Sequence, residues 1–273
     1  MGGSELKKES RLLAECTARE VQDFLRTGFK VIVPVGATEQ HGPHAPMGTD
    51  TILATEVSVR IAKRIGALVA PGFPYGLSGD HLGFPVAYLS VKTLTGLVQD
   101  VCISLAETGF REIIFVNGHY TNIIGMAAAI AEVGDRLPNG AFAFPFNYWD
   151  ALPAEQLQQY LSAAAGLHAN IGETSAVMAV DESLVDMERA VDEYPRFAKP
   201  PSAAQVAAFF FSGKGTTYRA TRSGVWGDPR QSSAERGRIY LKQIEEAGVR
   251  FIEEVEEMFR TFPSRSELPG AKA

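Results

Sequence analysis

Acidic and imidazole side chains gather in one short segment of the sequence, "VIVPVGATEQHGPHAPMGTD" at residues 31–50. Glu39, His41, His44 and Asp50 follow directly on an apolar run, and the chain has only five histidines in all. Carboxylates and imidazoles together are a ligand set suited to zinc, manganese or iron. Asp50 could bridge two ions, although an aspartate before a helical pattern is also typical of a helix N-cap. The segment therefore predicts a metal centre.

The other three histidines lie in comparable surroundings, in "GLSGDH" (His81), "NGHYTN" (His119) and "HANIGETS" (His168). A lone histidine after a strand is more often structural than a ligand, so each segment alone is weak. None of the histidines falls on the apolar face of a predicted helix, however, and this joint pattern favours one shared site. Glu173, in the third segment, is either a further ligand or a first-turn acid stabilised by the helix dipole.

The elements that must position these residues can be read from the apolar pattern. Short apolar runs that end at Gly or Pro predict strands buried on both faces, at residues 30–36, 67–72, 112–118 and 141–146. Helical patterns are expected at about residues 18–27, 51–65, 94–105, 121–136, 153–164, 173–182 and 232–261. The alternation predicts an α/β fold with a mostly parallel central sheet.

Ligand sites in such folds form beyond the carboxyl ends of the strands. The segment with Glu39 and the segment with His119 each follow a predicted strand, so we expect the two to meet at one sheet edge. The position of residues 168–175, which precede a helical pattern, stays open at this point.

One domain is expected over residues 1–273, with a core at about 18–262 and a frayed tail at 263–273. Residues 192–233 are rich in Pro, Gly and polar side chains. The segment could be a domain boundary, but a long covering loop before the last helix is favoured. The "AAFFF" run at 207–211 could pack in the core or between subunits.

Composition excludes several classes of function. The formal net charge of −6 and the isoelectric point near 5.5 argue against nucleic acid or an anionic membrane as the main partner. No apolar run approaches the length of a membrane-spanning helix, and the start of the chain lacks the apolar segment of a secretory signal. Two cysteines fit a reducing compartment. We expect a cytoplasmic protein that acts on a small molecule.

Competing catalytic motifs fit poorly. Ser78 and Ser175 lack the G-x-S-x-G turn of a hydrolase nucleophile. "SGKGTT" at 212–217 lacks the spacing of a phosphate-binding loop, and no G-x-G-x-x-G follows a predicted strand. A serine-nucleophile mechanism and a nucleotide-binding fold are therefore disfavoured.

Five segments together resemble the creatininase (creatinine amidohydrolase) family, in that family's order: "PVGATEQHGPHAPMGTD", "GLSGDHLGFP", "VNGHYTN", "HANIGETS" and "GVWGDPRQSSAERG". They run from about residue 30 to residue 240, and the first is the most specific. The resemblance implies a three-layer α/β/α subunit that typically assembles as a homohexamer. It also implies a hydrolytic centre of two divalent metal ions per subunit, zinc, manganese or iron.

Carried over residue by residue, the resemblance implies that Glu39 and His119 hold one metal and His41 the other. Asp50 would bridge the two ions. His168 matches the histidine with an acid/base role in the family.

The resemblance also implies neighbours of the substrate. Ser78 matches a position near the substrate, and Tyr120 matches the tyrosine beside the metal-binding histidine of creatininase itself. His81 could line the pocket or a subunit contact, and Trp226 could pack against a flat substrate ring, although such a tryptophan is more often core. His44 could orient a ligand or be a structural loop residue.

The chain departs from the family pattern at one position. Creatininase proper has a glutamate two positions after the "NGH" histidine, where it binds the second metal, but this chain has Thr121. We expect Glu173 to replace that ligand and so to belong to the metal and catalytic residues. The departure argues against creatinine as the substrate.

The implied reaction is hydrolysis of a C–N bond in a small amide, which could be cyclic, or in a formamide. A metal-bound hydroxide attacks, and His168 protonates the departing nitrogen. Ring opening of a cyclic ketone or sugar-derived substrate, and cleavage of a small peptide, are alternatives on the same centre. A non-catalytic metal- or ligand-binding protein is the alternative of another class. The enzyme is favoured by the joint presence of Glu39, His41, Asp50, His119, His168 and Glu173.

Overall fold

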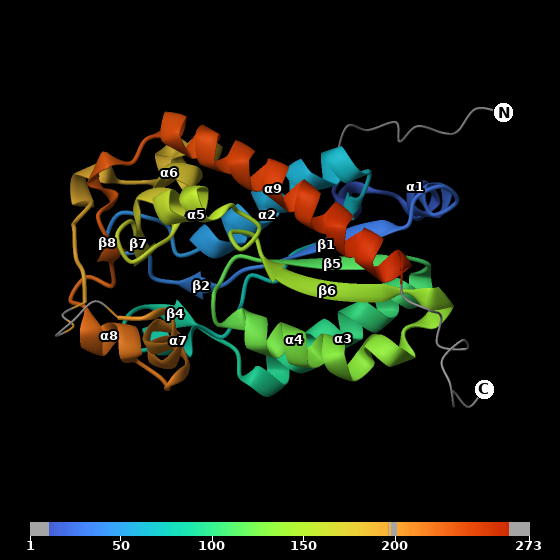
Figure 1. The fold of residues 1–273 in the computed structure, drawn as a ribbon, viewed down its shortest axis with the longest axis horizontal. Coiled ribbons are helices and arrows are strands. Elements are labelled where there is room, and N and C mark those ends of the chain that lie inside the picture. Colours follow the sequence, from blue (N-terminus) through green and yellow to red (C-terminus); the bar gives the residue numbers. More distant parts are fainter. Residues whose placement is uncertain (1–10, 196, 198–200, 262–273) are drawn as a thin grey trace.

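A parallel sheet with the strand order β3–β1–β5–β6 forms the centre of the protein (Figure 1). The computed structural model describes residues 11–195, 197 and 201–261. The strands of this sheet are β1 (Lys30–Val35), β3 (Leu68–Val69), β5 (Glu112–Asn117) and β6 (Phe142–Asn147). All four predicted strands are confirmed, with β3 shortened to two residues.

Both faces of the sheet are buried, which explains its continuous apolar runs. In β5, Ile113 and Phe115 belong to one hydrophobic core, whereas Ile114 and Val116 belong to the other. Since successive strand residues point to opposite faces, a strand covered on both sides has no position left for a solvated polar residue.

Helices form the two outer layers (Figure 1). The core on one side of the sheet is completed by α3 (Val91–Thr108) and α4 (Asn122–Val133). The core on the other side is completed by α2 (Thr49–Ile65), α6 (Ile171–Val180) and α9 (Ala234–Arg260). The predicted three-layer α/β/α architecture is therefore confirmed.

Shorter elements surround the carboxyl end of the sheet or precede it. The remaining helices are α1 (Ala18–Phe24), α5 (Ala154–Tyr160), α7 (Ala203–Phe211) and α8 (Thr216–Ala220). The short strands are β2 (Thr38–Glu39), β4 (Val86–Ala87), β7 (Gly166–His168) and β8 (Trp226–Gly227). β2 pairs with β4 and β7 with β8, both antiparallel. Among the residues that the structure describes, no helix combines the length and the apolar composition that crossing a membrane requires.

The structure corrects the prediction for residues 192–233. This segment is not only a covering loop, because it holds α7, α8 and β8. A capping box between Ser202 and Gln205 starts α7. Its nearly uniform apolar sequence shows no helical period, and the Pro- and Gly-rich flanks concealed it. No side chain of α7 is fully buried, so the "AAFFF" run does not enter the core.

Two further boundaries differ from the prediction. Gly48 is the residue before α2, so Asp50 lies in the first turn and is not an N-cap. The helix expected at 153–164 ends at Tyr160. The tail predicted at 263–273 lies outside the described residues.

Candidate metal centre

The carboxyl ends of β1 and β5 bring the two predicted segments together. Val35, the last residue of β1, pairs with Asn117, the last residue of β5, so the chain leaves both strands side by side. A Cβ added at Gly118 would lie 2.4 Å from the main-chain oxygen of Asp50. The segment after β5 can therefore approach the start of α2 only because this residue is glycine.

Six predicted site residues meet at this edge, none of them more than 7% exposed: Glu39, His41, Asp50, His119, His168 and Glu173. Glu39 ends β2, His168 ends β7, and Glu173 lies in the first turn of α6. The open question about the third segment is thus answered, because β7 and α6 place it against the first two.

Hydrogen bonds determine which ring nitrogen of His119 faces the cluster. The Thr121 hydroxyl lies 3.2 Å from the Leu77 carbonyl oxygen, to which it donates, and 2.7 Å from His119 Nε2. Since its hydrogen is used, the hydroxyl accepts from His119 Nε2–H. The lone pair of Nδ1 then faces Glu39 Oε2 at 3.1 Å and Asp50 Oδ2 at 3.3 Å. In the sequence, Thr121 stood only for the absence of the glutamate ligand. In the structure, its hydroxyl orients the ring of His119.

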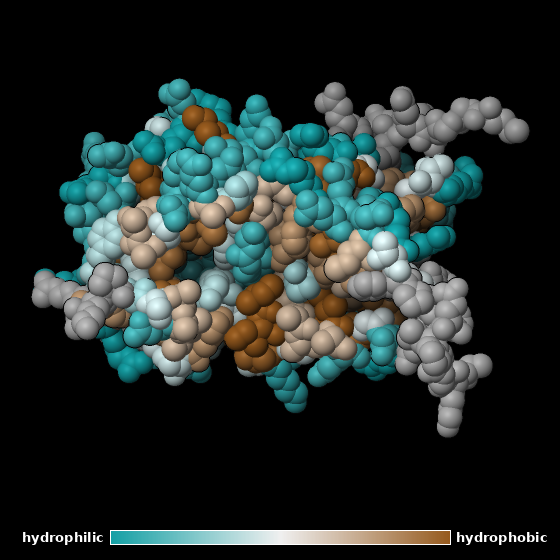
Figure 2. Space-filling model, viewed as in Figure 1, coloured by the Kyte–Doolittle hydropathy of each residue, from teal (hydrophilic) through white to brown (hydrophobic). Residues whose placement is uncertain are grey.

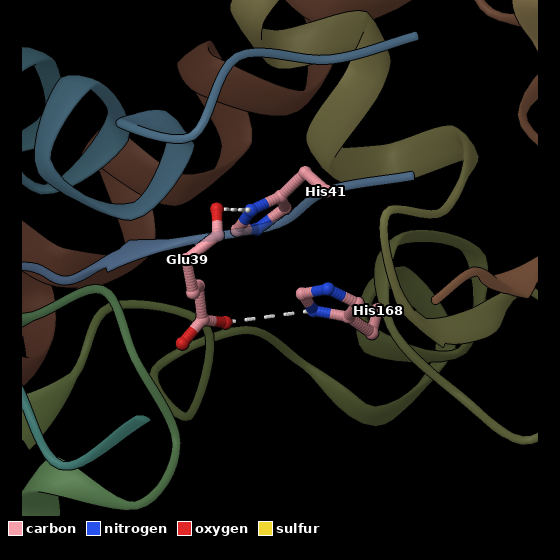
Figure 3. A group of neighbouring side chains, drawn as sticks. All are labelled: Glu39, His41 and His168. Carbon is pink, nitrogen blue, oxygen red and sulfur yellow. Dashed lines mark hydrogen bonds and ion pairs between the residues drawn. The ribbon is translucent and has the colours of Figure 1, made fainter. Parts of the chain in front are cut away.

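His41 and His168 are oriented by carbonyl oxygens, which can only accept. His41 Nδ1 lies 3.3 Å from the Glu39 carbonyl oxygen (Figure 3). This leaves the lone pair of Nε2 to face Asp50 Oδ1 at 3.2 Å. His168 Nε2 lies 2.7 Å from the Gln40 carbonyl oxygen, which leaves Nδ1 facing Glu39 Oε1 at 3.7 Å (Figure 3).

Lone pairs that face carboxylate oxygens at these distances repel one another unless positive charge lies between them. Glu39 Oε2, Asp50 Oδ2 and His41 Nε2 are buried and have no hydrogen bond. Three sets of donor atoms lie within 4.8 Å of one another: Glu39–Asp50–His119, His41–Asp50–Glu173 and Glu39–His41–His168. The first two sets share Asp50, so the residues present fit two divalent cations with Asp50 between them.

The pKa values of the histidines also show that the buried carboxylates favour positive charge between them. Burial by itself lowers the pKa of His41, but Asp50 and Glu173 outweigh it, and the pKa is raised to about 9. Burial likewise opposes protonation of His119, but Glu39 and Asp50 raise its pKa well above the ordinary value. Burial lowers the pKa of His168 well below its usual range, and this ring is neutral at pH 7.

Glu173 is held in place by the backbone before α6. The Ala169 amide donates to Glu173 Oε2 at 2.7 Å, and Ala169 has a left-handed backbone with φ of 50°. Such a conformation in a residue other than glycine persists where the surrounding structure enforces it, often at a functional site. Burial raises the pKa of Glu173 to about 7. The expected replacement ligand thus lies beside His41 and Asp50.

Gln40 contacts two histidines of the site, His81 and His168, and sequence reasoning missed it. Its side-chain oxygen accepts from the Gly42 amide at 2.8 Å, so its nitrogen faces His81 Nδ1 at 2.8 Å and donates to it. The hydrogen of His81 must then lie on Nε2, which is 3.3 Å from Glu39 Oε1 and 3.2 Å from Asp80 Oδ2. His81 therefore directs its Nε2–H toward the carboxylates of Asp80 and Glu39. The position of Gln40, between two ligands in sequence, was the available signal.

A cavity of about 300 Å³ opens onto the metal cluster. His81 and Tyr120 line it as expected, together with Asp80, Trp149 and Phe210. Figure 2 shows the surface hollowed on this side, with hydrophobic side chains at the rim.

Two residues expected at the substrate do not line this cavity. Ser78 is fully buried, and its hydroxyl has no hydrogen bond. Trp226 is 4% exposed and stacks on Phe210. Trp226 therefore packs against a residue that lines the cavity and does not itself form the substrate wall. His44 Nε2 lies 3.0 Å from Thr174 Oγ1 on α6, so His44 ties its loop to the helix that carries Glu173.

Comparison with known proteins agrees with this geometry. The family model described as "Creatininase: Creatinine amidohydrolase" matches residues 14–252. Creatinine amidohydrolase of Pseudomonas putida is 34% identical over 250 residues, which are 86% of this chain and 93% of the relative. A mycofactocin precursor peptide peptidase of Mycolicibacterium smegmatis is 43% identical over 126 residues, 44% of this chain and 49% of the relative. A 3-dehydro-scyllo-inosose hydrolase of Thermotoga maritima is 28% identical over 189 residues, 66% of this chain and 59% of the relative.

Solved structures are similar over nearly the whole chain. A mutant creatininase of zinc–zinc type has a TM-score of 0.77 at 32% identity, covering 90% of this chain and 98% of the other. A manganese creatininase has a TM-score of 0.76 at 31% identity with the same coverage.

Proposed function

Since the chain belongs to the creatininase family of metal-dependent hydrolases, we propose that it cleaves a C–N bond of a small amide at a centre of two divalent metal ions. The observation that carries the proposal is the buried donor set with Asp50 common to two groups. Unpartnered oxygen and nitrogen atoms of three of its residues support a cation there, because burying such atoms without a partner is unfavourable.

Each residue of the cluster has one role in this proposal. Glu39 and His119 would hold one metal, His41 and Glu173 would hold the other, and Asp50, which belongs to both groups, would be shared between them. Zinc, manganese and iron all suit this mixture of carboxylate and imidazole, and relatives have been solved in zinc and manganese forms. When bound, the metals lower the pKa of water and polarise a carbonyl group.

His168 moves the proton. Its Nε2–H is held by the Gln40 carbonyl oxygen at 2.7 Å, so the free Nδ1 faces the cluster. Because the ring is neutral, Nδ1 can accept a proton from the attacking water and then deliver it to the departing amide nitrogen. His81 stays outside this proton path and directs its Nε2–H toward the carboxylates of Asp80 and Glu39.

Two relatives support other substrates for the same centre. One is named as a peptidase and another as a hydrolase of a cyclic inosose. Peptide cleavage and ring opening of a cyclic ketone are therefore the alternatives. A cavity of about 300 Å³ favours a small molecule over a long peptide. The homohexamer implied by the family resemblance and the cytoplasmic location expected from composition stay predictions; light scattering on the purified protein tests the first.

The experiment combines metal content with product release. Wild-type protein and Glu173→Ala are prepared without chelator, metal is counted per chain, and both are incubated with small amides, formamides and a cyclic ketone. We expect about two metals per chain in the wild type, about one in the variant, and release of amine only by the metal-loaded wild type. If only the cyclic ketone were cleaved, ring opening would become the proposed function in place of amide hydrolysis. If no compound were cleaved, the non-catalytic alternative would be favoured.

A further inference from the structure

The cavity above the metal centre has two chemically different walls. One wall consists of the acidic and imidazole residues of the cluster with Asp80 and His81. The other wall is apolar and is formed mainly by Tyr120, Trp149, Leu161, Leu167, Val206 and Phe210. A substrate bound for reaction must place its scissile group at the first wall and the rest of its structure against the second.

The apolar wall is built into the fold. Ala203, Val206 and Phe210 lie three and four residues apart, so one face of α7 lines the cavity. The Phe210 ring stacks on Trp226 with centroids 5.8 Å apart, and it packs edge-to-face with Tyr120 at 5.6 Å. These contacts hold Phe210 in place before any ligand arrives, as expected of a binding wall.

Charge complementarity narrows the class of substrate. Among the described residues that line the cavity there is no lysine and no arginine. A carboxylate or phosphate on the non-reacting part of a substrate would meet no cation away from the metals, and it would lie near Asp80 or the apolar wall. Burying such a charge without a partner is strongly unfavourable.

We propose that the group attached to the scissile amide is uncharged and apolar, an aromatic ring or a branched aliphatic chain, and that it binds between α7 and the wall of Trp149 and Leu167. The proposal rests on the proposed amide hydrolysis at the metal centre. The cavity of about 300 Å³ has room for about ten groups the size of water, at ~30 Å³ each. That is enough for an amide together with a ring. A small polar ring such as creatinine would leave the apolar wall without contact.

Hydroxamic acids test this binding without catalysis, because the hydroxamate group chelates the metals whatever its substituent. Calorimetry on metal-loaded wild type compares acetohydroxamate, phenylacetohydroxamate and succinomonohydroxamate. We expect the phenyl compound to bind at least about tenfold more tightly than the methyl compound, since its ring is removed from water. The carboxylate compound is expected to bind no more tightly than the methyl compound.

Variants of α7 identify the wall. Phe210→Ala should remove most of the preference for the phenyl compound. Phe209→Ala, the same change on the same helix but outside the cavity lining, removes only packing against Phe210 and Trp226, and it should reduce the preference less. Val206→Lys should reverse the order by favouring the carboxylate compound over the methyl compound.

The outcomes separate the two proposals. Equal affinity of wild type for the methyl and phenyl compounds overturns the apolar substrate class and leaves the metal hydrolase intact. A tighter carboxylate compound in wild type overturns it as well. Failure of all three compounds to bind metal-loaded protein means that the metals are not open to a substrate, and the proposed function fails with it.

Discussion

Two buried clusters of charge lie at opposite ends of the same pair of strands. At the amino ends of β1 and β5, Lys30 lies 3.3 Å from Glu112 Oε2 and 2.5 Å from Glu256 Oε1. At the carboxyl ends, the carboxylates of Glu39 and Asp50 face histidines, whose side chains can be uncharged near neutral pH. Among the described residues, no lysine or arginine forms an ion pair with these two carboxylates.

The difference lies in the source of positive charge. Lys30 supplies it within the chain, so the first cluster is a structural ion pair that needs nothing else. The second cluster has three buried carboxylates and only imidazoles, whose lone pairs are directed at the same oxygens. A cluster of this second kind is stable when a cation is bound, and this distinguishes a binding site from an ion pair.

Among the variants considered, Asp50→Asn should have the largest effect on the metal centre, because Asp50 belongs to two of the groups of metal-binding side chains. We expect both metals to be lost and hydrolysis to fall by about a thousandfold or more. Elemental analysis of the purified variant and amine release measure the two effects. Asp80→Asn is the matched control, since Asp80 lines the cavity without belonging to any metal group, and it should keep both metals. Full metal content in Asp50→Asn would contradict the assignment.

Lys30→Met tests the other cluster. Removing the cation leaves Glu112 and Glu256 buried without it, and we expect the free energy of unfolding to fall by about 3 kcal/mol. Denaturant unfolding measures this change. Metal content per folded chain should stay at the wild-type value, because Lys30 lies at the far end of β1 from the metal residues. A loss of metal from the folded variant would show that the two ends are coupled.

Thr121→Val asks whether the hydroxyl orients a ligand. The variant keeps the shape of the side chain but cannot accept from His119 Nε2–H, so we expect metal affinity to fall by about 10–100-fold. Competition with a chelator of known affinity measures it. Thr121→Ser retains the hydroxyl and should restore affinity to near the wild-type value. Equal affinity of the valine and serine variants would remove the orienting role.

The smallest effect concerns pH and the amino-end cluster. Burial, with Glu256 nearby, raises the pKa of Glu112 to about 7 from its ordinary value near 4.5. The folded protein therefore binds this proton more tightly than the unfolded chain, and the contribution of Glu112 to stability falls as pH rises from about 4.5 to 7. We expect the unfolding free energy of Glu112→Gln, relative to wild type, to increase over this range by about 1–2 kcal/mol. A difference independent of pH would refute the shifted pKa.

Local sequence pattern was sufficient for the core of the fold. Apolar runs and helical periods depend on neighbours a few residues apart, so they marked the strands 30–36 and 112–118 and most of the outer helices. The same local reasoning failed at α7, where a uniformly apolar segment carries no period. It also left a helix N-cap open as the alternative for Asp50, because a helix boundary cannot be located to one residue from pattern alone.

The sequence by itself determined which donor types the protein has and in what order, because affinity for zinc, manganese or iron is a property of carboxylate and imidazole groups. Only the tertiary structure decided how those donors are arranged. Gln40 and His168 are 128 residues apart, yet the Gln40 carbonyl oxygen fixes which nitrogen of His168 faces the site. Thr121 gained its role from the Leu77 carbonyl oxygen, 44 residues away. A ring nitrogen is oriented by the partner it meets in space, and that partner is set by the packing of β1, β5 and α6 around one sheet edge.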